Sequence, residues 1–592
     1  MPSLEYTPSA SPTPASLKTW WKESCVYQVY PASFCDSNGD GIGDIKGIIS
    51  KLDHIKNLGA NILWLNPVFD SPQVDMGYDI SDYYGIYPPY GTLQDMDELA
   101  AEIHARGMKL VMDLVVNHTS DKHKWFQASR ASVENEYRDW YIWRKPVFRD
   151  GERHPPNNWR SYFGGSAWTY DEQTGEYYLH LFASEQPDLN WENPRVRDAV
   201  HDIVRYWLNH GADGFRMDVI NFISKDQSFP DAAFTNPDSP WQSGKEHYAA
   251  GPRLHEYLQG IGKILKEYEA FSVGEMLDVD DPTEILKAVG HDRDEINMAF
   301  HFEIVNLDHA PTDKFGHRDW QLREIKAIVA KWQQFMHDNH GWNALYLENH
   351  DQGRSVSRFA SDQPEFREVG AKMLATLLGS QSGTVFIYQG QELGMPNVPE
   401  DWPLENYRDI ETLNHWKELT SSFPENTLLH ERAKAEYRLK SRDNSRTPMQ
   451  WDDSAHAGFS TAQPWIPVHA DYATLNAALQ AKDPASVYSY WSQILDVRQQ
   501  YSDVLVYGSF QPIDPENATV FAFIRSGAES PQQQALVVLN FAAHKVSWTL
   551  PPKVISGPAH VVLSNYAGRV GSKLIESGTI SLGPYEALIS LS

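Results

Sequence analysis

The segment that decides the fold runs from residue 194 to residue 218 and reads PRVRDAVHDIVRYWLNHGADGFRMD. Its first half carries apolar residues at helical spacing, namely Val196, Val200, Ile203, Val204, Trp207 and Leu208. Pro194 suits the first turn of a helix and Gly211 suits its C-terminal cap. The residues from Asp213 to Met217 then predict a buried strand, and the carboxylate of Asp218 stands where that strand ends.

The same order of helix, glycine and strand occurs twice earlier in the chain. Helical apolar spacing is found in Ile45, Ile48, Ile49, Leu52, Ile55 and Leu58 before Gly59, and in Leu93, Met96, Leu99 and Ile103 before Gly107. The expected strands are 25–30, 61–65, 109–115, 213–217, 271–274, 296–300, 344–347 and 384–388. Helices alternating with eight such strands predict an α/β fold, a (β/α)8 TIM barrel. A doubly wound open sheet is the main alternative.

Uneven spacing between these strands predicts additional domains in a chain of 592 residues. About seventy residues rich in Trp, Tyr, Asn and Gly follow the third strand, which indicates a small inserted domain. Near the C-terminus, strands follow one another with few helices, which predicts an antiparallel β-sandwich. The expected units are a disordered tail (1–17), the barrel (18–118 and 189–512), inserted domain B (119–188) and an all-β C-terminal domain (513–592).

Composition limits the classes of partner. Lys and Arg number 51 against 79 Asp and Glu, so the net charge is −28. Such a surface repels nucleic acids and anionic membranes and suits a neutral small-molecule substrate. No run of 18 apolar residues occurs, so no membrane span is expected. The sequence indicates no organic cofactor and leaves the oligomeric state open.

The compartment is predicted from the cysteines and from the N-terminus. Only Cys25 and Cys35 occur, which excludes a disulfide framework, although the two could pair with each other. The first twenty residues lack the apolar segment of a secretory signal. We therefore expect a cytoplasmic protein, with secretion as the alternative in which the sequon at Asn517 would matter.

Three carboxylates stand where predicted strands end. Asp218 closes one strand, Glu275 closes Phe-Ser-Val-Gly-Glu (271–275), and Asp351 closes Leu-Tyr-Leu-Glu-Asn-His-Asp (345–351). In a parallel barrel the C-terminal strand ends meet on one rim, where the loops build the active site. Acids gathered there raise one another's pKa values, a cost that is understandable if a sugar carbon is attacked and protonated at that place.

Six motifs in order make the chain resemble glycoside hydrolase family 13, the α-amylase family, and within it the α-glucosidases and oligo-1,6-glucosidases of the fungal maltase and isomaltase type. The motifs are DLVVNH (113–118), QPDLN (186–190), GFRMD (214–218), GEM (274–276), ENHD (348–351) and RDNSRTPMQW (442–451). The resemblance covers about residue 20 to the C-terminus. It implies a retaining, exo-acting α-glucosidase that acts on short α-glucosides by double displacement.

The resemblance implies a role for each carboxylate. Asp218 matches the nucleophile, and Arg216, two residues earlier on the same strand face, would help to keep it ionised. Glu275 matches the general acid/base, which needs a raised pKa. Asp351 matches the acid that holds sugar hydroxyls and stabilises the transition state. If Asp218 and Glu275 act as a retaining pair, their carboxyl groups should lie about 5–5.5 Å apart.

The resemblance also implies the contacts of the terminal glucose. Asp75 would bind the 4- and 6-hydroxyls at a closed end, and Tyr78 would offer a stacking face. The remaining implied sugar contacts are His118, His350 and Arg446. Because aromatic rings can stack on sugar faces, Phe182 and Phe302 are weaker candidates for sugar contact. A pocket with a blocked end favours short substrates such as isomaltose, maltose and sucrose over intact starch.

A calcium loop is predicted between residues 36 and 44. Asp-Ser-Asn-Gly-Asp-Gly-Ile-Gly-Asp imitates the start of an EF-hand loop, but position twelve is Gly47 instead of the required Glu. The resemblance still implies structural Ca²⁺, with Asp36, Asn38, Asp40, Asp44 and the carbonyl of Ile42 as ligands. A metal-free Gly-Asp turn is the alternative.

Linkage preference is predicted from Val219, which follows the implied nucleophile. In related α-glucosidases, valine here tends to accompany action on α-1,6 bonds, whereas Thr or Ala accompanies α-1,4 preference; simple strand packing is the other explanation. Transfer of glucose to another sugar is also expected, because a covalent intermediate can be intercepted. The alternatives are a sucrose isomerase or transglucosylase and, less favoured, a non-catalytic binding subunit of the family.

Overall fold

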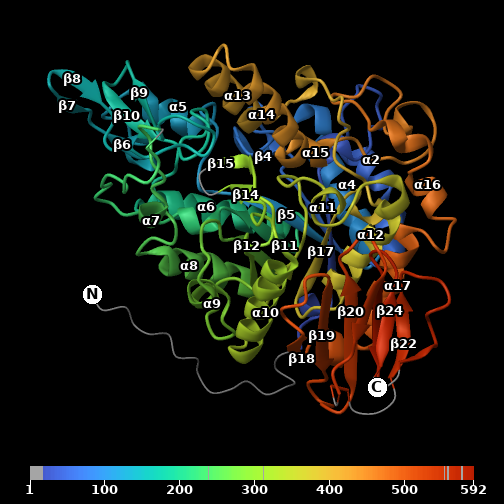
Figure 1. Cartoon of the computed structure of the whole chain (residues 1–592). Coiled ribbons are helices and arrows are strands. Elements are labelled where there is room, and N and C mark those ends of the chain that lie inside the picture. Colours follow the sequence, from blue (N-terminus) through green and yellow to red (C-terminus); the bar gives the residue numbers. More distant parts are fainter. Residues whose placement is uncertain (1–17, 238, 311–312, 553, 556–558, 575–577) are drawn as a thin grey trace.

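The computed structural model describes residues 18–592 except 238, 311–312, 553, 556–558 and 575–577, so the predicted tail 1–17 lies outside the described residues (Figure 1). Its centre is a sheet of eight parallel strands in the order β13-β12-β11-β5-β2-β1-β17-β16. A bridge between Ala299 and Asn343 joins the two outer strands and closes the sheet. The predicted (β/α)8 barrel is therefore confirmed. The strands are β1 (Cys25–Val29), β2 (Ile62–Leu65), β5 (Lys109–Val115), β11 (Gly214–Asp218), β12 (Phe271–Glu275), β13 (Met298–Phe300), β16 (Ala344–Leu345) and β17 (Thr384–Tyr388).

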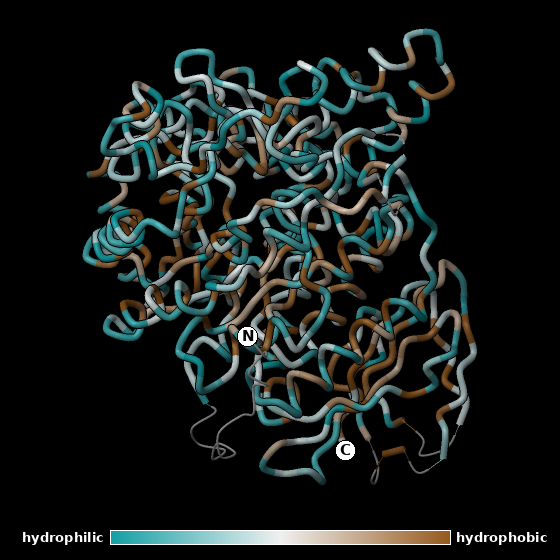
Figure 2. Tube along the Cα trace, turned by 90° about the vertical axis from the view of Figure 1, so that its left-hand side faces the viewer, coloured by the Kyte–Doolittle hydropathy of each residue, from teal (hydrophilic) through white to brown (hydrophobic). Residues whose placement is uncertain are grey.

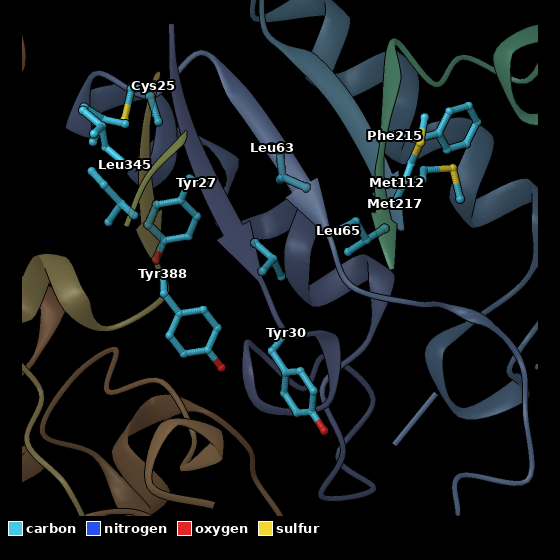
Figure 3. Packing of buried hydrophobic residues seen from close by; sticks show 14 of the residues in the cluster. Cys25, Tyr27, Tyr30, Leu63, Leu65, Met112, Phe215, Met217, Leu345 and Tyr388 are labelled. Atoms are coloured by element: carbon cyan, nitrogen blue, oxygen red, sulfur yellow. The ribbon is translucent and has the colours of Figure 1, made fainter. Parts of the chain in front are cut away.

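Alternate side chains of the barrel strands point to opposite faces, and both faces are buried. Leu63, Leu65, Met112 and Met217 belong to the large outer core that also contains helix residues (Figure 3). Their neighbours along the strands, such as Trp64, form a second cluster drawn from seven of the eight strands, which fills the barrel interior. Because both faces are apolar, the strands have near-continuous hydrophobic runs.

Helices cover the outside of the barrel and follow the predicted pattern with one difference. The expected helix over 45–58 is broken at Lys51, whose φ of −113° and ψ of 5° end one helix and begin the next. Gly59, Gly107 and Gly211 follow their helices with positive φ, as C-terminal caps require. The principal helices are α2 (Ile45–Ser50), α3 (Leu52–Leu58), α4 (Leu93–Ala105), α6 (Pro194–Asn209), α8 (Leu254–Glu267), α9 (Pro282–Val289), α10 (Leu322–Asp338), α11 (Ser355–Phe359), α12 (Pro364–Gly379), α17 (Val487–Gln500) and α18 (Ser502–Leu505).

The segment 119–188 forms a small unit of its own beside the barrel rim, to the upper left in Figure 1. It contains an antiparallel sheet in the order β6-β10-β9, a separate hairpin of β7 with β8, and one helix. The elements are α5 (Lys124–Ala131), β6 (Trp143–Arg144), β7 (Val147–Arg149), β8 (Glu152–His154), β9 (Trp168–Asp171) and β10 (Glu176–Leu179). We call this segment domain B.

The C-terminal part is an antiparallel β structure, drawn in red at the lower right of Figure 1. A six-stranded sheet in the order β18-β19-β20-β25-β22-β23 lies with a two-stranded sheet of β21 and β24. The predicted boundary at 513 falls inside β18, which begins at Ser509 and pairs with β19. The strands are β18 (Ser509–Ile513), β19 (Val520–Ser526), β20 (Gln534–Asn540), β21 (Val546–Thr549), β22 (Ala559–Ser564), β23 (Lys573–Leu574), β24 (Thr579–Leu582) and β25 (Ala587–Leu591).

Further helices and short strands lie on the rim that carries the carboxylates. They are β3 (Phe69–Asp70), β4 (Asp82–Ile86), α7 (Lys245–Tyr248), β14 (His309–Ala310), β15 (Asp313–His317), α13 (Ile410–Ser422), α14 (Thr427–Lys440), α15 (Asp443–Arg446) and α16 (Ala477–Gln480). Hydrophobic residues gather inside the barrel and the C-terminal sheet, and hydrophilic ones gather on the outer loops (Figure 2). Across the described parts of the chain, none of the helices combines the length and apolar character that crossing a bilayer needs.

Candidate active site at the C-terminal rim

Because side chains alternate in direction along a strand, the predicted acids point into the barrel. In β11, Phe215 and Met217 face the outer helices, so Arg216 and Asp218 face the interior. In β12, Val273 belongs to the interior cluster, so Glu275 two residues later faces the same way. Both carboxylates stand at the last residue of their strands, because β11 ends at Asp218 and β12 ends at Glu275.

One guanidinium group joins three interior acids. Nη1 of Arg216 donates to Asp218 at 2.6 Å and to Asp113 at 2.8 Å, and Nη2 donates to Glu275 at 2.7 Å. The Arg216 side chain is 1% exposed. Asp218 and Glu275 are therefore neighbours, each on a different terminal nitrogen of the same arginine. The predicted contact of Arg216 with Asp218 is present.

Burial raises the pKa values of both catalytic candidates. Desolvation raises the pKa of Asp218 to about 7, with Asp113 and Asp351 adding to the rise and Arg216 opposing it. Desolvation likewise raises the pKa of Glu275 to about 8, against Arg216 and the backbone N–H of Val219. Arg216 lowers the pKa of Asp218, as expected from sequence, but the effect of burial is larger. The order of the two values still leaves the last proton on Glu275.

Asp351 has the opposite electrostatic setting. Burial alone would raise its pKa, but His350, Arg442 and Arg446 together hold the pKa well below its usual range. Arg446 donates to Oδ1 at 2.9 Å and Arg442 donates to the same oxygen at 3.2 Å. His350 Nε2 lies 3.1 Å from Oδ2. Asp351 is therefore the acid of the trio that stays ionised most firmly.

The three acids open on a cavity of about 300 Å³. Predicted residues that line it are Asp75, Tyr78, His118, Phe182, Asp218, Val219, Glu275, Phe302 and Asp351. Arg216, His350 and Arg446 do not line it. They lie behind the wall, where Arg216 and Arg446 hold carboxylates and His350 stacks on the ring of Tyr78 at 5.1 Å and 6°.

Arg442 takes the place in the cavity that the sequence assigned to Arg446. Its guanidinium donates to Asp75 at 2.9 Å and to Asp351 at 3.2 Å, and it lines the cavity. Arg446, one helical turn later, instead donates to the carbonyl of His350 and to Asp351. The motif at 442–451 contains both arginines at helical spacing, so it points to this helix but does not distinguish which arginine faces the sugar.

The part of the cavity wall around Asp75 is built by a buried polar network. Gln186 donates to Asp75 Oδ2 at 3.0 Å, and the other oxygen of Asp75 accepts from Arg442. Nε2 of His118 lies 3.1 Å from the carbonyl of Tyr78 and 3.2 Å from Gln186. Gln186 is the first residue of the QPDLN motif, and this position in the motif is the sequence signal for its place in the site. These contacts fix Asp75 and His118 before any ligand arrives.

Val219 adopts an unusual backbone conformation immediately after Asp218. Its φ is 33° and its ψ is 43°, in the left-handed region where β-branched residues are true outliers. Its N–H donates to Glu275 Oε2 at 3.1 Å. The turn therefore links the end of β11 to the acid at the end of β12, and the side chain of Val219 lines the cavity.

The outer part of the cavity contains polar residues that sequence reasoning missed. Tyr162 of domain B donates to Asp278, and Lys314 pairs with Glu411 of α13 at 2.5 Å. The remaining lining residues are Phe163, Leu277, Asn306, His309 and Gln352. These residues come from segments far apart in sequence and outside any strand-end motif, so sequence alone offered no signal for them.

The predicted calcium loop has oxygen donors but also many internal hydrogen bonds. Asp36 accepts the backbone N–H groups of Asn38, Gly39 and Gly41, and Asp44 accepts that of Ser37. Asp36 and Asp44 are 9% and 4% exposed, yet neither forms an ion pair with a described Lys, Arg or His.

An all-oxygen donor set with uncompensated carboxylates fits Ca²⁺. No group of three or more His, Cys, Asp or Glu that could hold a metal occurs among the described residues. A cation in this loop would therefore also need the amide oxygen of Asn38 and the carbonyl of Ile42.

Barrels with paired acids at the C-terminal rim include the glycoside hydrolases, in which two carboxylates act on one anomeric carbon. This chain belongs to that class through the alpha-amylase family, whose catalytic-domain profile matches residues 28–508.

Relatives narrow the comparison. The chain is 50% identical to an alpha-glucosidase of Schizosaccharomyces pombe over 574 residues, which is 96% of this chain and 97% of that protein. It is 48% identical to an oligo-1,6-glucosidase of Halalkalibacterium halodurans over 97% of this chain and 99% of that protein. Among solved structures, an isomaltulose synthase mutant from Erwinia rhapontici NX5 in complex with sucrose matches with a TM-score of 0.90 and 40% identity, covering 97% of this chain and 99% of that one.

Proposed function

We propose that this protein is a retaining, exo-acting α-glucosidase that releases glucose from the non-reducing end of short α-glucosides. The observation that carries the proposal is the pair Asp218 and Glu275, held on one guanidinium at the edge of a cavity. Retaining glycosidases need two carboxyl groups close together, one as nucleophile and one as proton donor. The named relatives support a glucosidase reading of this pair.

The first half of the reaction uses the proton held by Glu275. Glu275 donates it to the glycosidic oxygen while Asp218 attacks the anomeric carbon, so the aglycone leaves and a glucosyl ester forms on Asp218. In the second half, the Glu275 carboxylate removes a proton from water, and the water oxygen attacks the anomeric carbon. The bond from that carbon to Asp218 breaks, and the Asp218 carboxylate is released. Asp351, ionised throughout, is placed to hold sugar hydroxyls and to balance positive charge on the ring.

The closed end of the cavity supports exo action. Arg442 ties Asp75 to Asp351, so a terminal glucose would meet charged groups that can accept and donate hydrogen bonds to its hydroxyls. In this proposal the pocket ends at these charged groups, so a chain that continues beyond the terminal sugar is not accepted. Intact starch is therefore a poor substrate in this proposal, and short α-glucosides are good ones.

Val219 supports a preference for α-1,6 bonds within this proposal. Its side chain lines the cavity beside the acid/base, where the leaving group departs. In the resemblance drawn from sequence, valine here accompanies α-1,6 action. Transglucosylation accompanies hydrolysis whenever a sugar hydroxyl reaches the glucosyl ester before water does.

Sucrose isomerisation is the second candidate, supported by the likeness to an isomaltulose synthase structure with bound sucrose. The barrel and the paired acids serve both reactions, because isomerisation also passes through transfer of a glucosyl group. The difference lies in whether fructose is released or is bonded again through another hydroxyl. Lining residues outside the paired acids, such as Lys314 and Asp278, would decide between them.

Sugar profiles over time with isomaltose, maltose, sucrose and starch side by side test the proposal. We expect fast glucose release from isomaltose, slower release from maltose, and little from starch. NMR of the first product should show the α-anomer, and an initial β-anomer would reject the retaining scheme. Conversion of sucrose mainly to another disaccharide would favour the isomerase instead.

The Asp218→Asn variant is the matched control for these profiles. It keeps the shape and the contact with Arg216 but removes the nucleophile, so turnover should fall by at least about 10⁴-fold. An unchanged thermal unfolding curve shows that the fold is kept. Residual activity above that level would mean that another group attacks the sugar.

Structural Ca²⁺ in the loop 36–44 is a further part of the proposal. The oxygen donors, and the absence of an ion pair to Asp36 or Asp44 within the described chain, support it. A bound cation would stabilise the folded state by mass action. Excess chelator should lower the melting temperature, and added Ca²⁺ should restore it. A melting temperature that chelator does not change would favour a metal-free turn.

We also propose a cytoplasmic location for the protein. Cys25 and Cys35 are both buried and free, which is the state expected in a reducing compartment. Fractionation of cells that express the natural gene tests this location, and recovery from the culture medium would overturn it.

A further inference from the structure

A second cavity, of about 410 Å³, lies at the end of the barrel opposite the carboxylates. Lys22 lies three residues before β1 begins and Trp342 two residues before β16 begins, so both mark the N-terminal ends of strands. The other wall comes from the C-terminal domain, including Ser526 and Glu529. The proposed active site takes no part in this cavity, because Asp218 stands at the C-terminal end of β11.

Lys22 is the unusual residue of this cavity. It is 7% exposed, and within the described chain its ammonium group forms neither a hydrogen bond nor an ion pair with an acid. The nearby carboxylate of Glu529 is already paired with Lys18 at 2.6 Å. Burial lowers the pKa of Lys22 to about 8. A cation removed from water without a counter-ion is costly, so an unmatched lysine at this depth calls for an explanation.

Aromatic rings compensate Lys22 only in part. Its Nζ lies 4.6 Å from the ring centroid of Trp342 and 5.3 Å from that of Trp21. Such contacts offset only part of the cost of burying an ion.

A neighbouring cavity of about 750 Å³ shares Lys22, His340 and Trp342 with the first. Lys22 therefore stands where the two spaces meet. His340 can donate a hydrogen bond there as a neutral imidazole, since burial lowers its pKa. The rest of the first cavity is largely apolar at Met336, Tyr507 and Pro531.

We propose that this cavity binds a small organic anion, with its charged head on Lys22 and a flat apolar body against Trp342 and Met336. A carboxylate on Lys22 supplies the missing counter-ion, and the apolar body fills a wall that water solvates poorly. An inorganic anion would pair with the charge of Lys22 but would leave the apolar wall in contact with water. In a chain of net charge −28, such a local cationic site is selective, because the rest of the surface repels anions.

Calorimetric titration with 2-naphthoate, a probe with a flat apolar body and one carboxylate, tests the site on the full chain. We expect one molecule to bind per chain, at least about tenfold more tightly than the neutral analogue 2-naphthalenemethanol, since tenfold corresponds to about 1.4 kcal/mol. Equal affinities of the two probes, or no binding of 2-naphthoate, would overturn the proposal without any variant.

Two variants then locate the site. Lys22→Met keeps the length and the apolar stem but removes the charge, so 2-naphthoate should bind at least about tenfold more weakly while the neutral probe is unaffected. Lys22→Arg keeps the charge and should stay within about threefold of the wild type. Both variants should retain wild-type turnover of isomaltose, because the cavity lies away from the rim. Unweakened binding of 2-naphthoate by the Lys22→Met variant would place the anion elsewhere and overturn the assignment.

Discussion

At the scale of single residues, burial affects the pKa values of Asp218 and Glu275 more than neighbouring charges do. Desolvation is the largest cause of both raised pKa values, and Arg216 only limits the rise. Because the two carboxyl groups interact through one guanidinium, the two apparent pKa values describe the pair and not the separate residues. Near neutral pH the pair retains one proton, and this is the proton that an acid catalyst donates.

The pH dependence of kcat/KM follows from these two constants. Below an apparent pKa of about 7, Asp218 becomes protonated and cannot attack, so activity falls as the pH falls. Above about 8, Glu275 loses its proton and cannot donate it, so activity falls as the pH rises. A bell-shaped profile with its maximum between these values is expected for isomaltose.

The Glu275→Gln variant separates the two limbs of that profile. With a p-nitrophenyl α-glucoside, whose leaving group needs little protonation, the residual activity should keep the acid limb and lose the basic one. A wild-type profile that stays flat up to about pH 10 would contradict the assignment of Glu275 as the acid.

Residues at strand ends were predictable, whereas residues brought in by loops were not. Asp218 and Glu275 were found because a strand has a fixed alternation and the barrel a fixed rim. Arg442 was missed because two arginines share one helical turn and only packing decides which one faces the cavity. Asp278 and Lys314 lie on segments with no periodicity, so their positions depend on tertiary contacts alone.

At the scale of elements, short apolar runs located all eight barrel strands, because both faces of each strand are buried. The exception among the helices is instructive. Residues 45–58 carry an unbroken apolar spacing, yet the helix is interrupted at Lys51, where the backbone leaves helical geometry. A periodic pattern reports which side is buried and is insensitive to a local kink that keeps that side buried.

Buried ion pairs fix the rim elements to one another, and Asp308 is the clearest case. Its carboxylate, 3% exposed, pairs with Arg358 of α11 at 2.6 Å and with Lys440 of α14 at 2.5 Å. Although burial opposes it, these two cations hold the pKa of Asp308 well below its usual range. The stabilisation is therefore present above the unfolded pKa of about 4 and is lost as the pH falls further.

The Asp308→Asn variant should destabilise the fold at neutral pH by about 3–5 kcal/mol, because two buried cations lose their partner. Calorimetric melting measures the loss. The matched control is Asp294→Asn, whose partner Lys266 is 69% exposed and whose loss should cost about 1 kcal/mol or less. Equal effects of the two variants would show that Asp308 does not tie the rim together.

At the scale of the whole molecule, charge selects the substrate. The net charge is −28, and the cavity is lined by six acids, Asp75, Asp218, Glu275, Asp278, Asp351 and Glu411, against the cations Lys314 and Arg442. A neutral disaccharide is indifferent to this field, whereas an anionic one is repelled. The division into domains was predictable from composition. The contacts between domain B and the rim depend on side chains that only the folded chain brings together.

A disaccharide that carries a phosphate should be hydrolysed at least about tenfold less efficiently than its unphosphorylated counterpart at low ionic strength, and added salt should narrow the difference. The kcat/KM for isomaltose should change by less than about twofold over the same range of salt. Comparison of kcat/KM for both substrates at each salt concentration checks this. Preference for the phosphorylated sugar would point instead to a phosphate subsite around Lys314.

The guanidinium of Arg216 affects when Glu275 acts as an acid and when it acts as a base. When the proposed glucosyl ester forms, Asp218 stops being an anion, and the attraction that Arg216 divided between its acids passes to Asp113 and Glu275. With one negative neighbour fewer and a stronger attraction from Arg216, Glu275 has a lower pKa and stays ionised after it has given its proton to the leaving group. A single immobile side chain would thus convert the proton donor of the first half-reaction into the base of the second, without any movement of the protein.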